Sequence, residues 1–253
     1  MNTDTSKRPL GTRWCRIGIW LGIIAAVATI VGIIGGRTGL LSGLNAFMSF
    51  GIGGLLFFVG IIVTLIGLLL SKGTAGDASA TQSLAVILAG AAVIGGAAAT
   101  MPDTSGAPAI HDLTTDLDNP PEFVAILPLR ADAPNPPEYL DDGTAQQQRE
   151  AFPDLVTLHV NGPIDKVFVA AEQAVGDMGW ELVAADRAAG RIEATETTEW
   201  FGFKDDVVVR ITGDTNSAAV DVRSKSRVGR GDMGANERRI REYLVMLTEK
   251  IGD

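Results

Sequence analysis

Hydrophobic and polar positions divide the chain into an apolar first part and a patterned second part. Three runs in the first hundred residues contain no Asp, Glu, Lys, Arg or His: residues 17–36, 47–70 and 84–100. About 20 residues at the rise of an α-helix cross the hydrocarbon core of a bilayer. The pattern therefore predicts three transmembrane helices, of which the third is the shortest and the richest in Ala and Gly.

Basic residues around the apolar runs predict the orientation of the anchor. Residues 1–16 carry four of them (Lys7, Arg8, Arg13 and Arg16), whereas Arg37 is alone in the next loop and Lys72 in the third segment. The positive-inside rule places residues 1–16 in the cytoplasm. Three crossings then put the rest of the chain in the bacterial periplasm, at the inner membrane. Were the third run not a crossing, that part would be cytoplasmic.

Glycines recur at helical spacing inside the predicted spans, as in Gly18 and Gly22, and again in Gly53, Gly60 and Gly67. Small residues at this spacing let helices approach closely, so they favour packing among the three helices. The same glycine-lined helix surfaces are compatible with contacts between copies of the chain in a homo-oligomer. The spans carry no ionisable side chain, which argues against a transporter or a pump.

Prolines set apart the segment that follows the third span. Eight of the eleven prolines lie between Pro102 and Pro137. Because proline neither donates to a β-ladder nor continues a helix, residues 102–153 are predicted to form an extended linker, or strap, that runs over a surface.

Period-two and helical patterns alternate in residues 154–253. LVTLHV alternates as a strand, and Pro163 is placed to begin a helix that Gly179 ends. WELVAAD, RIEATETTEW, DDVVVRIT and SAAVDVRS follow as four strands with short turns, and a last helix starts near Asn236. The predicted fold is an α+β domain of order β-α-β-β-β-β-α, with an antiparallel sheet and helices on one face.

Charge separates the two parts as clearly as hydrophobicity does. Residues 1–101 hold six of the 21 basic and two of the 30 acidic residues, so the remainder has 15 basic and 28 acidic residues and a net charge of −13. Such a domain repels phosphate backbones, which argues against a nucleic-acid partner. The single cysteine, Cys15, excludes an intrachain disulfide. Common nucleotide-binding, thiol and zinc motifs are missing from the sequence, and no cofactor is expected.

Four segments carry a family resemblance. IHDLTTDLDNPPEF, MGWELVAAD, GRIEATETTEWFGFKDDVVVRI and VDVRSKSRVGRGDMGANERRIR occur in this order over about residues 109–250. Together they resemble the family catalogued as domain of unknown function 1499, whose members often carry transmembrane helices ahead of the domain. The resemblance implies no established activity, so no site residues follow from it.

HDLTTDLDNP, residues 111–120, concentrates one histidine and three aspartates. Counted as a calcium loop from Asp112, it places Leu117 where glycine is needed and Phe123 where an acid is needed. We therefore expect no metal site here and interpret the aspartates as turn residues that fix the strap. The other histidine, His159, is expected on the surface of its strand.

Glu196 is the weak catalytic candidate. The alternation of IEATETTEW puts it on the same face as Ile192 and Ala194, and a buried carboxyl can serve as a general acid. The alternative is that it pairs with a basic residue or lies at the rim of the sheet. Glu193 and Glu199 face the other way and are expected to form cross-strand ion pairs with Arg210 or Arg223.

Two further clusters are candidates for binding. Trp200, Phe201 and Phe203 surround Gly202, and they would form a pocket wall, a lip in the bilayer interface or a packed bulge. The glycine-rich run SKSRVGRGDMGANERR leads into a helix, whose N-terminus favours an anion. Its candidate anion ligands are Arg227, Arg230, Arg238 and Arg239, against the alternative of a solvated loop capped by Asp232 or Asn236.

Taken as a whole, the sequence predicts an integral membrane protein with a periplasmic binding domain. The expected partner is an anionic lipid headgroup or an envelope protein. An enzyme that uses carboxylates and a membrane-tethered scaffold remain the alternatives.

Overall fold

A computed structural model describes residues 10–71, 77–100, 107–140 and 142–252. The chain divides into two compact units, Met1–Pro102 with Glu199–Gly202, and Asp103–Thr198 with Phe203–Asp253. Each unit is considered by itself. Three of the basic residues that predict the orientation, Lys7, Arg8 and Lys72, lie outside the described residues, as does the start of the predicted linker.

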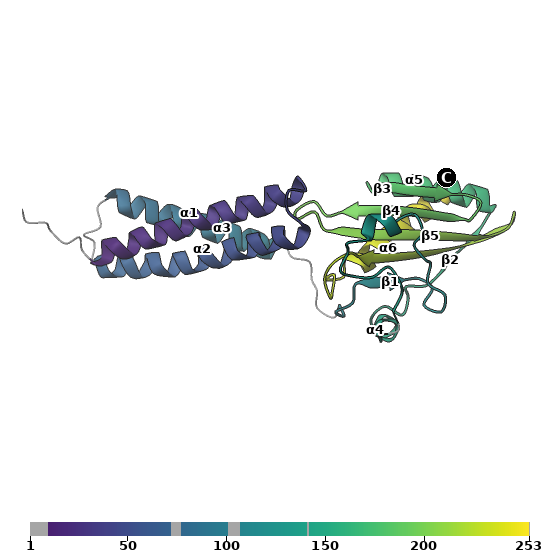
Figure 1. Cartoon of the computed structure of the whole chain (residues 1–253), viewed down its shortest axis with the longest axis horizontal. Coiled ribbons are helices and arrows are strands. Elements are labelled where there is room, and N and C mark those ends of the chain that lie inside the picture. Colours follow the sequence, from purple (N-terminus) through teal and green to yellow (C-terminus); the bar gives the residue numbers. More distant parts are fainter. Residues whose placement is uncertain (1–9, 72–76, 101–106, 141, 253) are drawn as a thin grey trace, which may run out of the picture. The chain divides into compact units, whose positions relative to one another are not determined.

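The first unit contains three helices that are long and apolar enough to cross a membrane (Figure 1). This confirms the three predicted apolar helices. Each begins before the corresponding uncharged run, at Leu10, Gly43 and Asp77 instead of residues 17, 47 and 84. Their bounds are Leu10–Arg37 for α1, Gly43–Ser71 for α2 and Asp77–Thr100 for α3.

Glycines form the packing surface between α1 and α2. A side chain at Gly67 would meet the backbone of Cys15, and one at Gly18 would meet the backbone of Gly60 and Thr64. Close backbone approach of this kind requires small residues. The predicted glycine seams therefore pack helices within one chain.

The second unit is built on a six-stranded antiparallel sheet (Figure 1). The strands are ordered β1-β6-β5-β4-β3, and β2 also pairs with β6. The predicted order β-α-β-β-β-β-α is found from β2 to α6. Bounds are Asp112–Thr114 for β1, Leu158–Asn161 for β2, Glu181–Asp186 for β3, Arg191–Thr197 for β4, Lys204–Gly213 for β5 and Ser217–Ser226 for β6.

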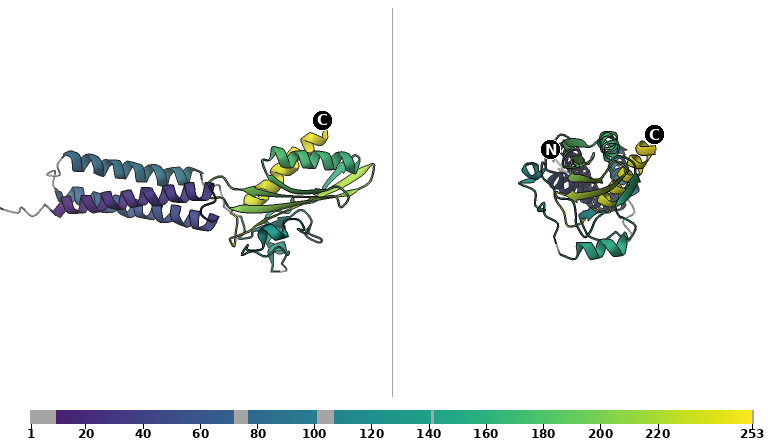
Figure 2. Two further views of the ribbon diagram at one scale, coloured as in Figure 1. Left: turned by 45° about the horizontal axis from the view of Figure 1, so that its top comes forward. Right: turned by 90° about the vertical axis from the view of Figure 1, so that its right-hand side faces the viewer.

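Two helices cover one face of the sheet, α5 (Ile164–Asp177) and α6 (Ala235–Gly252), as the left view of Figure 2 shows. The main core lies between them and the sheet. Val207, Val209 and Val222 reach it from alternate positions of β5 and β6, and Trp180 stacks on Tyr243 of α6 with ring centroids 5.2 Å apart. The period-two pattern predicted this face correctly.

The other face is covered by residues 107–153, which we call the strap; residue 141 is not described (Figure 2). The strap is more regular than its proline content suggests, since it contains β1, a 3-10 helix η1 (Leu127–Arg130) and α4 (Thr144–Ala151). Buried Gln148 of α4 closes the outer edge of β1. Its amide nitrogen donates to the carbonyl of Thr114 and its oxygen accepts the Thr114 N–H. A three-residue strand whose outer edge is closed by a side chain is too short to show a period-two pattern in the sequence.

Candidate functional site

Charged side chains occupy the face of β6 that the strap covers. Asp221, Arg223, Lys225 and Arg227 follow one another at every second position, while Val222 between them packs into the helix-side core. Asp221, Arg223 and Lys225 are almost completely buried. Burying charges is costly unless each is paired and hydrogen-bonded, so their partners determine what this face can do.

Asp112 of β1 pairs with two of these cations. Its two carboxylate oxygens each accept one bond of 2.8 Å from Arg223, and Lys225 Nζ lies 2.9 Å from the same carboxylate. The remaining donors of the two cations bind strap carbonyls, at Pro121 and Pro137 for Arg223 and at Glu138 for Lys225. Burial lowers the pKa of Lys225, which Asp112 partly offsets. Asp112 is thus a buried ion-pair partner rather than a turn residue.

Asp206 of β5 is the second buried carboxylate of this face. Arg130 of η1 donates to it over 2.9 Å, and Arg227 makes two bonds of 2.8 and 2.7 Å. Thr195 donates to the same carboxylate over 2.7 Å. Arg227 also donates to the carbonyl of Leu129, so the pair joins β5 and β6 to the strap.

Glu193 of β4 binds the strap backbone directly. Its carboxylate accepts the N–H groups of Val124, Ala125 and Ile126 at 2.9–3.0 Å, together with a 3.0 Å bond from Arg191. The expected cross-strand pairs with Arg210 or Arg223 are therefore wrong, since Glu199 forms its ion pair with Arg37. Glu193 lies opposite an apolar residue of β5 in the register, and the strap supplies donors that the strand pattern does not reveal.

HDLTTDLDNP serves both turns and ion pairs. Asp116 accepts the N–H groups of Asp118 and Asn119, which confirms the expected turn. Asp112 instead lines a small cavity together with His111 and Lys225. The cavity measures about 10 Å³, which is the space that one water molecule requires. Within the described part of the chain, no group of three or more His, Cys, Asp or Glu side chains could hold a metal ion.

Glu196 lies at the rim of the helix-side face. Its carboxylate binds Arg239 of α6, which also donates to Asp205 over 2.6 Å and to Ser224 over 3.0 Å. Glu196 is partly exposed, whereas the Arg239 side chain is almost completely buried. Glu196 is thus a rim carboxylate paired with a basic residue, which is the alternative to a catalytic role. His159 is exposed, as expected.

The four candidate arginines do not converge on one point. Arg227 binds Asp206 on the strap side, and Arg239 binds Asp205 on the helix side. Arg230 and Arg238 are exposed in the loop between β6 and α6 and at the first turn of α6. A carboxylate of the chain already lies at the helix N-terminus. Asp232 accepts the N–H groups of Gly234 and Asn236 at 2.9 and 2.7 Å, and burial raises its pKa.

The aromatic cluster forms the turn between β4 and β5. Gly202 has φ of 68°, a left-handed conformation that favours glycine, so it marks the predicted bend. Trp200 is 53% exposed, and Phe201 and Phe203 are half-buried. The N–H of Phe203 donates to the hydroxyl of Thr198 and closes the turn.

Four strand ends meet at one end of the sheet, which we call the entry end. β4 ends at Thr197 beside Lys204, the first residue of β5, and β6 ends at Ser226 close to Asp112, the first residue of β1. The N–H of Ser226 donates to the carbonyl of His111 over 2.9 Å. The β4–β5 turn, the β6–α6 loop and the point where the chain enters the domain therefore lie together.

Apolar and basic side chains are exposed at the entry end. Met233 of the β6–α6 loop is 51% exposed and, like Trp200, is absent from the core of the domain. It has φ of 56°, which a non-glycine residue rarely adopts. The exposed charged residues at this end are Glu199 and Arg230 of the two loops, Lys204 at the start of β5 and Arg238 in the first turn of α6.

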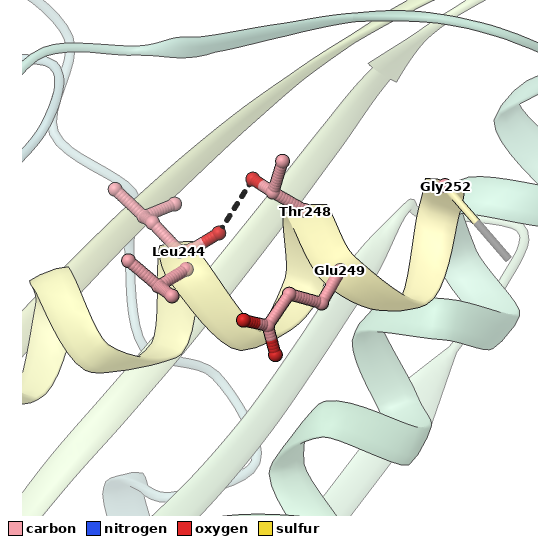
Figure 3. A pocket seen from close by; sticks show the side chains of 5 residues that line it. Leu244, Thr248, Glu249 and Gly252 are labelled. Carbon is pink, nitrogen blue, oxygen red and sulfur yellow. Dashed lines mark hydrogen bonds between the residues drawn. The ribbon is translucent and has the colours of Figure 1, made fainter.

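A second exposed surface lies on α6. Figure 3 shows a shallow, open depression along one side of the helix, lined by Leu244, Val245, Thr248, Glu249 and Gly252. The Thr248 hydroxyl donates to the carbonyl of Leu244 over 2.7 Å, a bond within the helix. The Thr248 hydroxyl therefore bonds within the helix itself, and Figure 3 shows no convergence of it with the Glu249 carboxylate on a shared point.

Comparison with known families assigns the second unit. Residues 112–247 match the family described as protein of unknown function, DUF1499, and the match covers more than half of the 253 residues. The chain belongs to this family. The DUF1499 match begins at the first residue of β1, so the family's domain includes most of the strap that the proline content predicted to be a linker. A comparison with curated proteins finds no match.

Sequence reasoning missed the buried charges that hold the strap of this DUF1499 domain, above all Asp112, Arg130, Glu193 and Asp206. One signal was available. A central strand that alternates Val and Ser with Asp, Arg, Lys and Arg presents a charged face, and such a face inside a domain requires a polar cover. The proline-rich segment was the only part of the chain left to provide it.

Proposed function

We propose that the protein is a bacterial inner-membrane binding protein whose domain lies in the periplasm and binds a component of the cell envelope through its entry end. The observation that carries this proposal is the coincidence of two features. The end of the sheet where the chain enters the domain is also the end that exposes Trp200, Met233 and three basic side chains.

Covalent connection keeps this end close to the membrane. Only residues 101–106 separate the last described residue of α3 from Ala107 of the strap. At about 3.6 Å per residue, these peptide units span at most roughly 25 Å. A domain held this closely can meet envelope components at the bilayer surface.

The polar chemistry of the domain supports binding over catalysis. Glu196, the candidate acid, is engaged by Arg239, and the buried carboxylates Asp112 and Asp206 are paired with cations of the strap face. These groups stabilise the fold, whereas the exposed residues of the entry end face outward. The periplasmic orientation rests on the basic N-terminal segment and on three crossings.

Photocrosslinking in native membranes tests the proposal. A benzophenone amino acid replaces Trp200 at the entry end or, as a control, exposed Thr215 in the turn between β5 and β6 at the opposite end of the sheet. We expect adducts with an envelope component from position 200 and none from position 215. Equal adducts from both positions, or none from position 200, would contradict binding through the entry end and favour a tethered scaffold.

The orientation has a separate test. Alkaline phosphatase fused after Asp253 is active only when it is exported, so we expect an active fusion. An inactive fusion in cells that contain the full-length fusion protein would place the domain in the cytoplasm.

A further inference from the structure

Exposed apolar and basic residues occur together at the entry end. We infer that this surface docks onto the lipid bilayer itself, with Trp200 and Met233 at the level of the headgroups and Lys204, Arg230 and Arg238 on anionic phosphate groups. This inference rests on the proposed function, because it names the envelope component that the entry end binds.

The apolar part of the surface has the chemistry of the bilayer interface. Trp is enriched at membrane–water interfaces, where its ring lies among the headgroups. Met233 presents a flexible thioether side chain from a loop in a left-handed conformation. Both side chains are about half exposed, on two loops that the strand register places at the same end of the sheet. Two large apolar residues on neighbouring loops form a pair of contacts suited to shallow insertion.

The charges of the surface are opposite to those of the domain. The three exposed cations Lys204, Arg230 and Arg238 and the exposed acid Glu199 together carry a net charge of +2. The segment 102–253 as a whole carries −13. The acidic remainder is repelled by an anionic membrane, while the entry end is attracted to it. This asymmetry orients the domain, and each basic residue near an anionic surface raises the affinity about fivefold.

The donors that would bind phosphate are side chains rather than the helix N-terminus. Asp232 already accepts the N–H groups at the start of α6, and Arg227 and Arg239 are held by Asp206 and Asp205. Arg230 and Arg238 have no carboxylate partner among the described residues. Exposed guanidinium groups suit a laterally mobile layer of headgroups better than a single enclosed phosphate.

Fluorescence of the full chain in vesicles tests the inference. Met233→Cys in a Cys15→Ser background is labelled with the dye NBD, whose emission shifts to the blue and brightens in an apolar environment. Thr215→Cys, labelled in the same way, is the matched control. A second preparation keeps Cys15, which is buried and which a surface label does not reach, in case the Ser variant folds poorly.

Two vesicle compositions separate the charge effect from insertion alone. In phosphatidylcholine mixed with phosphatidylglycerol, we expect a blue shift at position 233 and none at 215. In phosphatidylcholine alone, the shift should be smaller. Arg230→Glu with Arg238→Glu should shift the equilibrium between docked and undocked domain in anionic vesicles by well over an order of magnitude toward the undocked state, and it should abolish the difference in blue shift between the two compositions.

NBD emission from position 233 at the wavelength typical of water, in both vesicle compositions, would overturn the inference. Such a result together with a protein adduct from position 200 in the photocrosslinking experiment would leave the proposed function standing with a protein partner. Aqueous emission from position 233 together with no adduct from position 200 would contradict both this inference and the proposed function.

Discussion

Glu193→Gln offers a test of how the strap is held. The Glu193 side chain is fully buried, and its two oxygens share four donors. One oxygen accepts Val124 and Ile126, and the other accepts Ala125 and Arg191. Glutamine keeps one acceptor and turns the other into a donor. In either orientation two buried or part-buried donors lose their acceptor, which costs about 1–3 kcal/mol for each donor.

The loss should appear as easier opening of the strap. With about 3 kcal/mol lost, amide exchange at residues 124–126 should accelerate by roughly a hundredfold, since about 1.4 kcal/mol corresponds to a factor of ten. Hydrogen exchange with mass spectrometry on the full chain in detergent measures this directly. Glu122→Gln makes the same chemical change at an exposed strap residue and should leave exchange unchanged. Unaltered protection of the amides at 124–126 in Glu193→Gln, or an equal loss of protection in both variants, would refute the role of Glu193 in holding the strap.

Two other predictions concern the strap and the helices. Burial raises the pKa of Tyr139 to about 12, and burial also raises that of Tyr243, the only other tyrosine. Because the pKa of each phenol is higher in the folded than in the unfolded chain, the tyrosines contribute stability that is complete below pH 10 and is lost as the pH rises toward 12. Absorbance at 295 nm should therefore show no phenolate near pH 10. Half of the full phenolate signal at pH 10 would disprove the burial of the tyrosines. In the first unit, Gly53→Leu should overpack the α1–α2 contact and speed thiol labelling of buried Cys15 about tenfold or more. Gly51→Leu, where a side chain meets open space, should not, and equal labelling of the two variants would contradict the packing.

The sequence was most informative where one local pattern determines one element. Uncharged runs predicted three helices, and period-two alternation with short turns predicted the meander from β3 to β6. The strap was harder to predict because its order comes from partners far away in the chain. Asp112 and Arg223 are separated by 111 positions, and Glu193 binds amides nearly seventy residues away. Pairings of this kind leave no periodicity within a short segment.

The candidate site shows the same limit at closer range. Four arginines within thirteen residues suggested one anion site, yet Arg227 continues a strand and Arg239 lies in a helix. The Arg227 side chain therefore lies on the strap side of the sheet, and the Arg239 side chain lies on the helix side. Proximity in sequence did predict the loop that exposes Arg230 and Arg238, as well as the bend at Gly202. Only the register of β4, β5 and β6 brings these two loops to one end.

The central claim is that the entry end lies against the bilayer, and collisional quenching measures this most directly. A fluorophore at position 233 or 215 of the full chain in anionic vesicles is quenched either by nitroxide-labelled lipids or by aqueous iodide. The account predicts that nitroxide lipids quench position 233, which is shielded from iodide, and that position 215 behaves in the opposite way. Equal quenching of the two positions by iodide, with no effect of nitroxide lipids at position 233, would contradict it.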